Sequence, residues 1–473
     1  MSASTQTASD GATSSACLWW DGLPRPAFGT VLEADSQTQI AIVGGGYTGL
    51  WTAFFLKLRN PGVAVTLIEA AQLGHGASSR NGGWFMGAIE NQGAFTGRDG
   101  RLPEAVLRQL TQLVGRAGTL FVAHGIDCDF AHGGALMTAA RHAGQTDHAR
   151  AELAMYRALG YGEHDYQWLS PQQMQQRVSV AHCSGGLFTP HVARIQPAKL
   201  LLGLAQAVKA MGVTIHEHTP ARKIDSGRVV TDRGVLTAEQ IVLATEGYSE
   251  HESNPLNRRL VPIQTGMVAT TPLPAELWEH IGLTQFETLA DFSRVPTYLQ
   301  RTADDRLVVG ARGSYHPQGR PQHALGDADA NLSKRRRIGE ALIPLIRDAE
   351  ISHCWGGSVG LSRHLCPHIV RDTHSRMITA GGYVGEGVGA SFLFGETVAD
   401  LLLGRDSELT QMPWIKEGSL DTFLPRWLPE PLPWLGVKLI EGLFAADDWC
   451  NTRYPGSAMS HALGWCCEHM DPR

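Results

Sequence analysis

The residues Gly44-Gly45-Gly46-Tyr47-Thr48-Gly49 are the part of this chain best suited to hold a phosphate. Gly44 permits a tight turn, Gly46 lets backbone N–H groups approach a pyrophosphate, and Gly49 lets a helix pack closely on a strand. The helix expected after the turn supplies free N–H groups and the positive end of its dipole. The motif therefore predicts a turn that binds phosphate.

The segments around this turn complete a strand–helix–strand unit. An apolar run, Ile40–Val43, precedes the glycines, and a second apolar run, Val63–Ile68, follows the helical pattern and ends at Glu69. Glu69 stands 20 residues after Gly49, where a carboxylate can accept both ribose hydroxyls of an adenosine and would repel the 2′-phosphate of NADP. The unit predicts a dinucleotide site, and the alternative is a glycine turn in an ordinary α/β sheet.

Three further segments combine glycines with small polar residues. They are Gly76-Ala77-Ser78-Ser79-Arg80-Asn81-Gly82-Gly83, Val242-Leu243-Ala244-Thr245-Glu246-Gly247-Tyr248, and the stretch 381–389, which precedes a predicted helix, Ser391–Leu403. In this order, the four motifs resemble those of the FAD-dependent amine and amino-acid oxidases, which include D-amino-acid oxidase, glycine oxidase and sarcosine oxidase. A GASxRNGG loop is typical of the γ-glutamylputrescine oxidase-like branch. The resemblance covers residues 36 to 412.

The resemblance implies that FAD is the cofactor and indicates how the motifs would hold it. Ser78 and Ser79 would bond to pyrophosphate or ribityl oxygens, Arg80 and Asn81 would lie beside the flavin ring, and the helix N-terminus near Gly387 would stabilise anionic reduced flavin. The full set of predicted cofactor-binding residues is Gly44, Gly45, Gly46, Thr48, Gly49, Glu69, Ala70, Ser78, Ser79, Arg80, Asn81, Gly82, Gly83, Ile224, Thr245, Gly385, Gly387 and Val388.

We expect the FAD to be bound without a covalent link. Relatives with cysteinyl-linked flavin carry that cysteine shortly after a Trp-Gly-Gly stretch. Here Trp355-Gly356-Gly357 is followed by Ser358-Val359-Gly360-Leu361, and Cys366 comes too late.

Four residues are candidates for catalysis, namely Arg80, Glu386, Tyr298 and Arg312. A cation such as Arg80 near the flavin would assist reaction with O₂, and Tyr298 with Arg312 would suit a substrate carboxylate. The alternative, which the hairpin pattern favours, is that Arg312 is a surface residue. Many relatives carry histidine at the position of Glu386. The Glu386 carboxylate would either attract a substrate ammonium or simply interact with a helix dipole.

The predicted reaction is oxidation of the C–N bond of a small amine or amino acid to an imine, by hydride transfer to flavin. The imine would then hydrolyse, and O₂ would reoxidise the flavin with release of peroxide. Three alternatives stay open: a dehydrogenase that passes electrons to a quinone or a protein, a flavin-binding protein without turnover, and a plain NAD dehydrogenase.

Composition argues against several other kinds of function and location. The 473 residues carry a net charge of −6, and the longest basic run, 334–337, fits a solvated helix face, so nucleic acid is not an expected partner. The eight cysteines form no CxxC pair, and we expect neither disulfides nor a bound metal. The first 16 residues lack the features of a signal peptide, and no run reaches the roughly 20 apolar residues of a membrane span, so we expect a cytoplasmic protein.

The pattern of elements predicts an α/β (α+β) protein in which a Rossmann-like FAD domain is interleaved with a separate antiparallel-sheet substrate domain. Residues 36–95, 190–258 and 352–412 are assigned to the FAD domain, and 96–189 and 259–351 to the substrate domain. Residues 1–35 are expected to be disordered or extended. Residues 413–473, rich in proline and tryptophan, are expected to form an extended segment on the surface.

Overall fold

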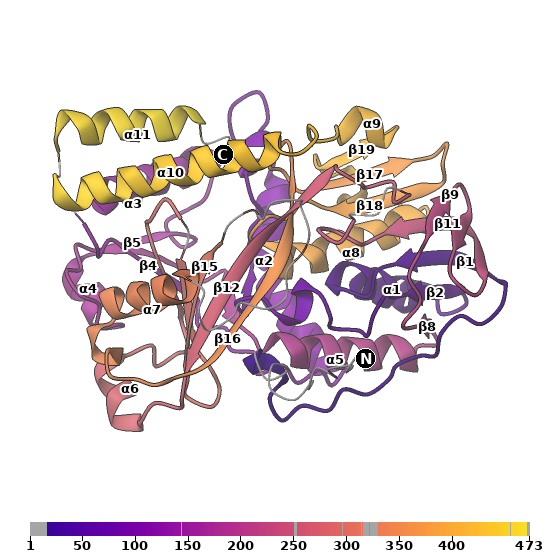
Figure 1. The fold of residues 1–473 in the computed structure, drawn as a ribbon, viewed down its shortest axis with the longest axis horizontal. Coiled ribbons are helices and arrows are strands. Elements are labelled where there is room, and N and C mark those ends of the chain that lie inside the picture. Colours follow the sequence, from indigo (N-terminus) through magenta and orange to yellow (C-terminus); the bar gives the residue numbers. More distant parts are fainter. Residues whose placement is uncertain are drawn as a thin grey trace, which may run out of the picture.

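The computed structural model describes residues 17–142, 144–249, 253–295, 297–313, 315, 321, 330–454 and 456–470. Two large sheets lie side by side, one on the right and one on the left of Figure 1. This arrangement confirms the predicted α/β class with two separate sheets.

The first sheet contains the predicted strand–helix–strand unit at its centre. β1 (Ser36–Val43) pairs in parallel with β2 (Val65–Ile68) on one side and with β11 (Val235–Leu243) on the other. The strand order is β19-β17-β18-β11-β1-β2-β8; in addition, the short strand β10 pairs antiparallel with β11, and β9 pairs antiparallel with β10. The remaining bounds are β8 Thr214–His216, β9 Lys223–Asp225, β10 Arg228–Val230, β17 His368–Asp372, β18 Met377–Gly381 and β19 Ile415–Glu417.

Alternate residues of these strands face two different layers, as the period of a strand requires. On β1, Ile40 and Ile42 join one buried cluster, and Ala41 and Val43 join another. The first cluster includes many residues of the helices α1 (Tyr47–Arg59), α2 (Glu104–Ala123), α5 (Pro197–Ala210) and α8 (Gly387–Leu402). The glycine turn therefore sits between β1 and α1 at the edge of a well-packed layer.

The second sheet has the order β16-β12-β15-β14-β13-β4-β6-β5. Its pairs are antiparallel except that β13 runs parallel to β4. The strands are β4 Ala135–Thr138, β5 Gln167–Leu169, β6 Gly186–Thr189, β12 Leu260–Thr270, β13 Thr288–Asp291, β14 Thr297–Arg301, β15 Leu307–Arg312 and β16 Ile351–Ser362. The nearby helices are α3 Gly144–Leu159, α4 Pro171–Gln175, α6 Ala275–Ile281 and α7 Ala330–Leu342.

A two-stranded ribbon directly follows the serine-rich loop. β3 (Trp84–Met86) pairs with β7 (Val192–Arg194), so Trp84 lies opposite Arg194. Phe85 points into the helical layer, where its ring contacts Phe121 and Phe392. The ribbon therefore anchors one end of the loop to the core of the first layer.

The strand pairing does not match the domain boundaries expected near residues 352 and 96. β16 pairs with β12 from Leu260 to Thr270, and so belongs to the second sheet. Conversely, α2 buries Leu110, Leu113 and Val114 in the helical layer of the first sheet. We propose that residues 352–362 belong to the substrate domain and that α2 belongs to the FAD domain.

The expectation of an extended C-terminal segment is wrong. After β19 and the short helix α9 (Leu420–Phe423), the chain forms two helices, α10 (Leu432–Arg453) and α11 (Ala458–Met470), drawn in yellow in Figure 1. Proline is tolerated in the first turn of a helix, where its missing N–H has no partner to lose. Pro433 stands in that turn of α10, and no proline follows until residue 455.

The N-terminal residues that the structure describes are packed on the body. Leu18–Trp20 form the 3₁₀ turn η1, and Trp19 is buried beside Trp355 of β16, with ring centroids 5.6 Å apart. Further along, the backbone N–H of Phe28 donates to the Glu217 carboxylate at 2.7 Å. The first 16 residues, for which disorder is predicted, lie outside the described residues. Within the described part, none of the helices combines the length and apolar character needed to cross a membrane.

Candidate functional site

The four sequence motifs line one cavity of about 410 Å³, which we call the cofactor cavity. It lies where β1, β2 and β11 end and where α1 and α8 begin. Of the predicted residues, those on its lining are Gly44, Gly45, Gly46, Thr48, Glu69, Ala70, Ser78, Asn81, Thr245, Gly385, Gly387 and Val388. Segments far apart in the sequence are thus brought to one site.

The glycine turn has the close approaches that its sequence implies. Gly44 has a φ of +112°, a conformation that side chains rarely adopt. A Cβ at Gly49 would lie 2.0 Å from the Gly44 carbonyl oxygen, so α1 could not pack on β1 with a larger residue there. A Cβ at Gly46 would lie 2.9 Å from Ser78 Oγ, which itself accepts a hydrogen bond from the Tyr47 N–H at 2.9 Å.

Glu69 lies directly after β2 with its carboxylate on the cavity wall. Its Oε2 accepts from the Gly45 N–H at 2.8 Å, and its Oε1 accepts from the Ala71 N–H at 3.0 Å. Burial raises the pKa of Glu69, and the two backbone donors partly oppose that rise. A carboxylate has about four lone-pair positions, so further donors such as ribose hydroxyls can still be accepted.

Several predicted cofactor residues lie outside the lining. Ser79 is fully buried, where its hydroxyl donates to the Gly74 carbonyl and accepts from Trp20 Nε1 at 3.1 Å. Gly82 and Gly83 pass beneath the second sheet, where Gln300 Nε2 donates to the Gly82 carbonyl at 2.6 Å. These three residues therefore support the loop without facing the cavity.

Ile224 is also absent from the lining. It lies on β9 with its side chain in the second buried layer of the first sheet. Instead, the preceding residues Thr219, Pro220 and Ala221 face the cavity. The strand β9 begins too late for its own backbone to reach the wall.

Two candidate catalytic residues lie on or against the loop of residues 76–83, which is predicted to contact the flavin and which we call the flavin loop. Tyr298, on β14, packs against Gly82, since a Cβ at Gly82 would lie 2.6 Å from its ring. Arg80 lies beside Gly357 of β16, and its Nε donates to the His75 carbonyl at 3.1 Å. Neither residue lines the cofactor cavity, but Arg80 of the loop and Tyr298 of β14 both lie where the loop meets the second sheet.

The other two candidates, Glu386 and Arg312, lie on elements outside this loop. Glu386 is the residue before α8, is half-buried and is close enough to Tyr166 to help raise the pKa of that phenol, which burial raises most. The backbone of Arg312 pairs with Thr265 of β12, and its side chain lies outside the described residues. Arg301, on the same hairpin, pairs with Asp305, its Nε lying 2.8 Å from Oδ1.

Glu246 is a residue of the cavity that the sequence reasoning did not single out. It is half-buried on the lining, and its Oε1 accepts from the Gly382 N–H at 2.7 Å and from the Tyr383 N–H at 3.3 Å. Its Oε2 has no hydrogen-bond partner among the described residues, and burial raises its pKa to about 7. The signal was an acid three residues after a buried strand, inside a motif already noted.

The residues present fit the cofactor that the motifs imply. A glycine cradle opens at the N-terminus of α1, the half-buried carboxylate of Glu69 stands on the wall beside it, and a second helix N-terminus, that of α8, faces the same cavity. The fold and the site together define a dinucleotide-binding oxidoreductase.

Comparison with known proteins identifies the family. Residues 39–401 match the family model described as DAO, FAD dependent oxidoreductase. The probable oxidoreductase OrdL of Rhizobium meliloti is 31% identical over 404 residues, which cover 83% of this chain and 89% of that protein. The chain therefore belongs to the DAO family and is an FAD-dependent oxidoreductase.

Two other proteins are similar over comparable lengths. The gamma-glutamylputrescine oxidoreductase of Escherichia coli is 26% identical over 386 residues, covering 79% of this chain and 85% of that protein. The crystal structure of glycine oxidase from Geobacillus kaustophilus has a TM-score of 0.66 at 21% identity, and the match covers 83% of this chain and all of that one. The latter shows that the fold is shared.

Proposed function

We propose that this protein oxidises the C–N bond of a small amine or amino acid to an imine, which water hydrolyses to a carbonyl compound. O₂ accepts the two electrons and leaves as hydrogen peroxide. The observation that carries the proposal is the convergence of four separate motifs on the cofactor cavity, with the Glu69 carboxylate on its wall. The name of the Escherichia coli relative, which includes an amine, supports this class of substrate.

The lining residues suggest how FAD would be held. The backbone of Gly44–Gly46 and the N-terminus of α1 would bind the pyrophosphate, and Glu69 would accept from ribose hydroxyls. Ser78 and Asn81 would contact the middle of the cofactor, and the N-terminus of α8 would face the flavin. No cysteine of the described residues lines the cavity, which supports a non-covalent cofactor. When bound, FAD supplies the acceptor for a hydride from the substrate carbon.

Residues at the contact of the flavin loop with the second sheet would bind the substrate. Tyr298 packs directly over the loop, where its ring can hold the substrate against one face. Arg80 places a positive charge on the same loop, which would favour reduction of O₂. Glu386 would attract a substrate ammonium, and the local packing of the two sheets would exclude water from the reacting bond.

A panel of amines tests the proposal. Under anaerobic conditions, primary, secondary and diamine substrates are mixed with the purified protein, and bleaching of the flavin absorbance is followed. We expect at least one amine to bleach it and to release peroxide in air. Bleaching without peroxide would indicate a dehydrogenase that uses another acceptor, and no bleaching by any amine would contradict the proposal.

A further inference from the structure

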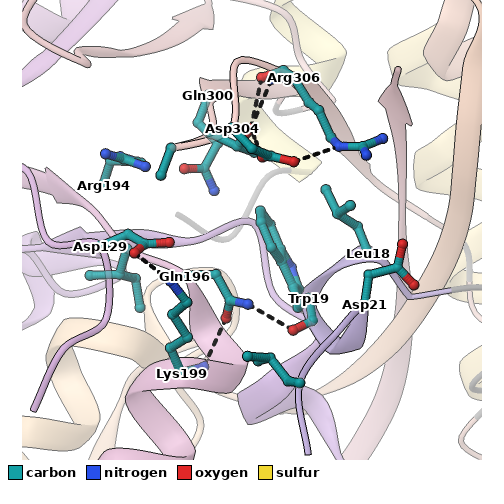
Figure 2. Close-up of a pocket in the computed structure, with 14 residues that line it drawn as sticks. Leu18, Trp19, Asp21, Asp129, Arg194, Gln196, Lys199, Gln300, Asp304 and Arg306 are labelled. Carbon is teal, nitrogen blue, oxygen red and sulfur yellow. Dashed lines mark hydrogen bonds and ion pairs between the residues drawn. The ribbon is translucent and has the colours of Figure 1, made fainter. Parts of the chain in front are cut away.

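A second cavity, of about 280 Å³, lies between η1, the N-terminal end of α5 and the β14–β15 hairpin (Figure 2). We call it the Arg194 cavity. It shares no lining residue with the cofactor cavity. One water occupies about 30 Å³ of liquid volume, so this space can hold a small organic molecule.

Arg194 is a buried cation on the wall of this cavity. Its residue is 5% exposed, its guanidinium stacks over the Phe286 ring at 4.4 Å, and burial lowers its pKa. Its Nε atom is buried and has no hydrogen-bond partner in the part of the chain that the structure describes. An unpaired buried charge is strongly unfavourable, so this guanidinium calls for an anion.

The acids around Arg194 already have cations of their own. Asp129 Oδ1 lies 2.6 Å from Lys199 Nζ, and Asp304 Oδ2 lies 2.7 Å from Arg306 Nε. Figure 2 shows these pairs at the border of the cavity, with Arg194 apart from them. The charge of Arg194 is therefore the one on this wall that lacks a close partner among the described residues.

Gln300 adds an acceptor beside this cation. It is 1% exposed, and its Nε2 donates to the Gly82 carbonyl, which fixes the amide so that Oε1 is the free end. That Oε1 is buried and has no partner within the described residues. The wall thus presents both a donor that needs an anion and an acceptor that needs an N–H or O–H group.

We propose that the Arg194 cavity binds a small carboxylate that also carries a hydrogen-bond donor, as an amino acid or a hydroxy acid does. The carboxylate pairs with the Arg194 guanidinium, and the donor reaches Gln300 Oε1. Because Gln300 also holds Gly82, the occupied cavity steadies the loop between the two cavities. The carboxylate belongs either to a separate molecule or to the far end of an amine substrate.

Calorimetric titration of the FAD-loaded protein with L-lactate tests the site, and L-lactamide serves as the uncharged control. We expect lactate to bind at millimolar concentrations, lactamide to bind more weakly, and Arg194→Met to weaken lactate binding about tenfold or more. Arg194→Lys should fall between the two. Arg301→Met is the matched control, since Arg301 stacks on the same Phe286 ring at 5.1 Å but does not line the cavity.

Flavin absorbance and melting temperature of each variant verify that it is folded and loaded. Equal lactate binding by Arg194→Met and the unsubstituted protein, or no lactate binding by the latter, would overturn the proposal, whether or not the protein oxidises amines. Kinetics then identify the source of the carboxylate. If Arg194→Met lowers kcat/KM for 4-aminobutanoate but not for 1-aminobutane, the carboxylate is part of the substrate; an unchanged ratio assigns the site to a separate molecule.

Discussion

At the scale of single residues, Gly46 is the position where the cofactor site depends most on the absence of a side chain. A valine there would put its Cβ 2.9 Å from Ser78 Oγ, and its methyl groups into the space proposed for the pyrophosphate. Gly46→Val should therefore abolish FAD binding in a folded protein, as measured by the flavin absorbance that remains after gel filtration. Gly115→Val is the control, because nothing lies within 4 Å of a Cβ at Gly115. Full FAD content in Gly46→Val would mean that this turn does not hold the cofactor.

The raised pKa of Glu246 predicts how the stability of the fold depends on pH. Its folded-state pKa is raised from 4.5 to about 7, so the folded protein keeps a proton that the unfolded chain releases. The resulting stability is fully present below about pH 4.5 and is lost as the pH rises to about 7, with an expected loss of about 3 kcal/mol. Glu69, whose pKa is also raised, acts in the same direction.

Glu246→Gln should flatten this dependence, and denaturant titrations of the free energy of unfolding between pH 4.5 and 8 measure it. The exposed acid in Glu276→Gln is the control. An identical pH profile for Glu246→Gln and the unsubstituted protein would show that the carboxyl is ionised throughout.

At the scale of elements, the turn η1 supports the flavin loop from outside the FAD domain. Trp19 Nε1 donates to the Asn81 carbonyl at 2.8 Å, and the residue is 2% exposed. Trp19→Ala should lower the free energy of unfolding by about 3–5 kcal/mol and weaken FAD binding, because Asn81 lines the cofactor cavity. Trp449→Ala, at an exposed position, should change both quantities little. If the two variants behave alike, η1 does not support the loop.

The N-terminus of α8 carries the second prediction at this scale. If Glu386, the residue before α8, attracts a substrate ammonium, Glu386→Gln should raise KM for cationic amines roughly fivefold, since a partly solvated pair is worth about 1 kcal/mol. FAD content should stay the same. Rates of flavin reduction across amine concentrations measure the effect. An unchanged dependence on amine concentration, with a loss of a few tenths of a kcal/mol in stability, would leave Glu386 as a helix-end residue.

At the scale of the whole molecule, the sequence predicted those parts of the structure that are formed by residues close together in the chain. The glycine turn, its flanking strands and Glu69 follow one another within 30 residues, so spacing alone defines them. Two features could not be predicted from the sequence, because they depend on contacts between segments that are distant in the chain. The glycine-rich strand β16 joins the second sheet through its partner β12, and Trp19 is buried in a cluster that includes Trp355 of β16. The orphaned guanidinium of Arg194 likewise becomes visible only when Asp129 and Lys199 are seen to pair with each other.

The central claim is that one cofactor cavity serves the oxidation of an amine, and anaerobic reduction of the bound flavin tests it most directly. The purified, yellow protein is mixed with the amine panel in the absence of O₂, and the flavin absorbance is recorded before and after air is admitted. We expect a C–N substrate to bleach the flavin, and air to restore the colour with one peroxide per flavin. A flavin that no amine reduces, although dithionite does, would contradict this account.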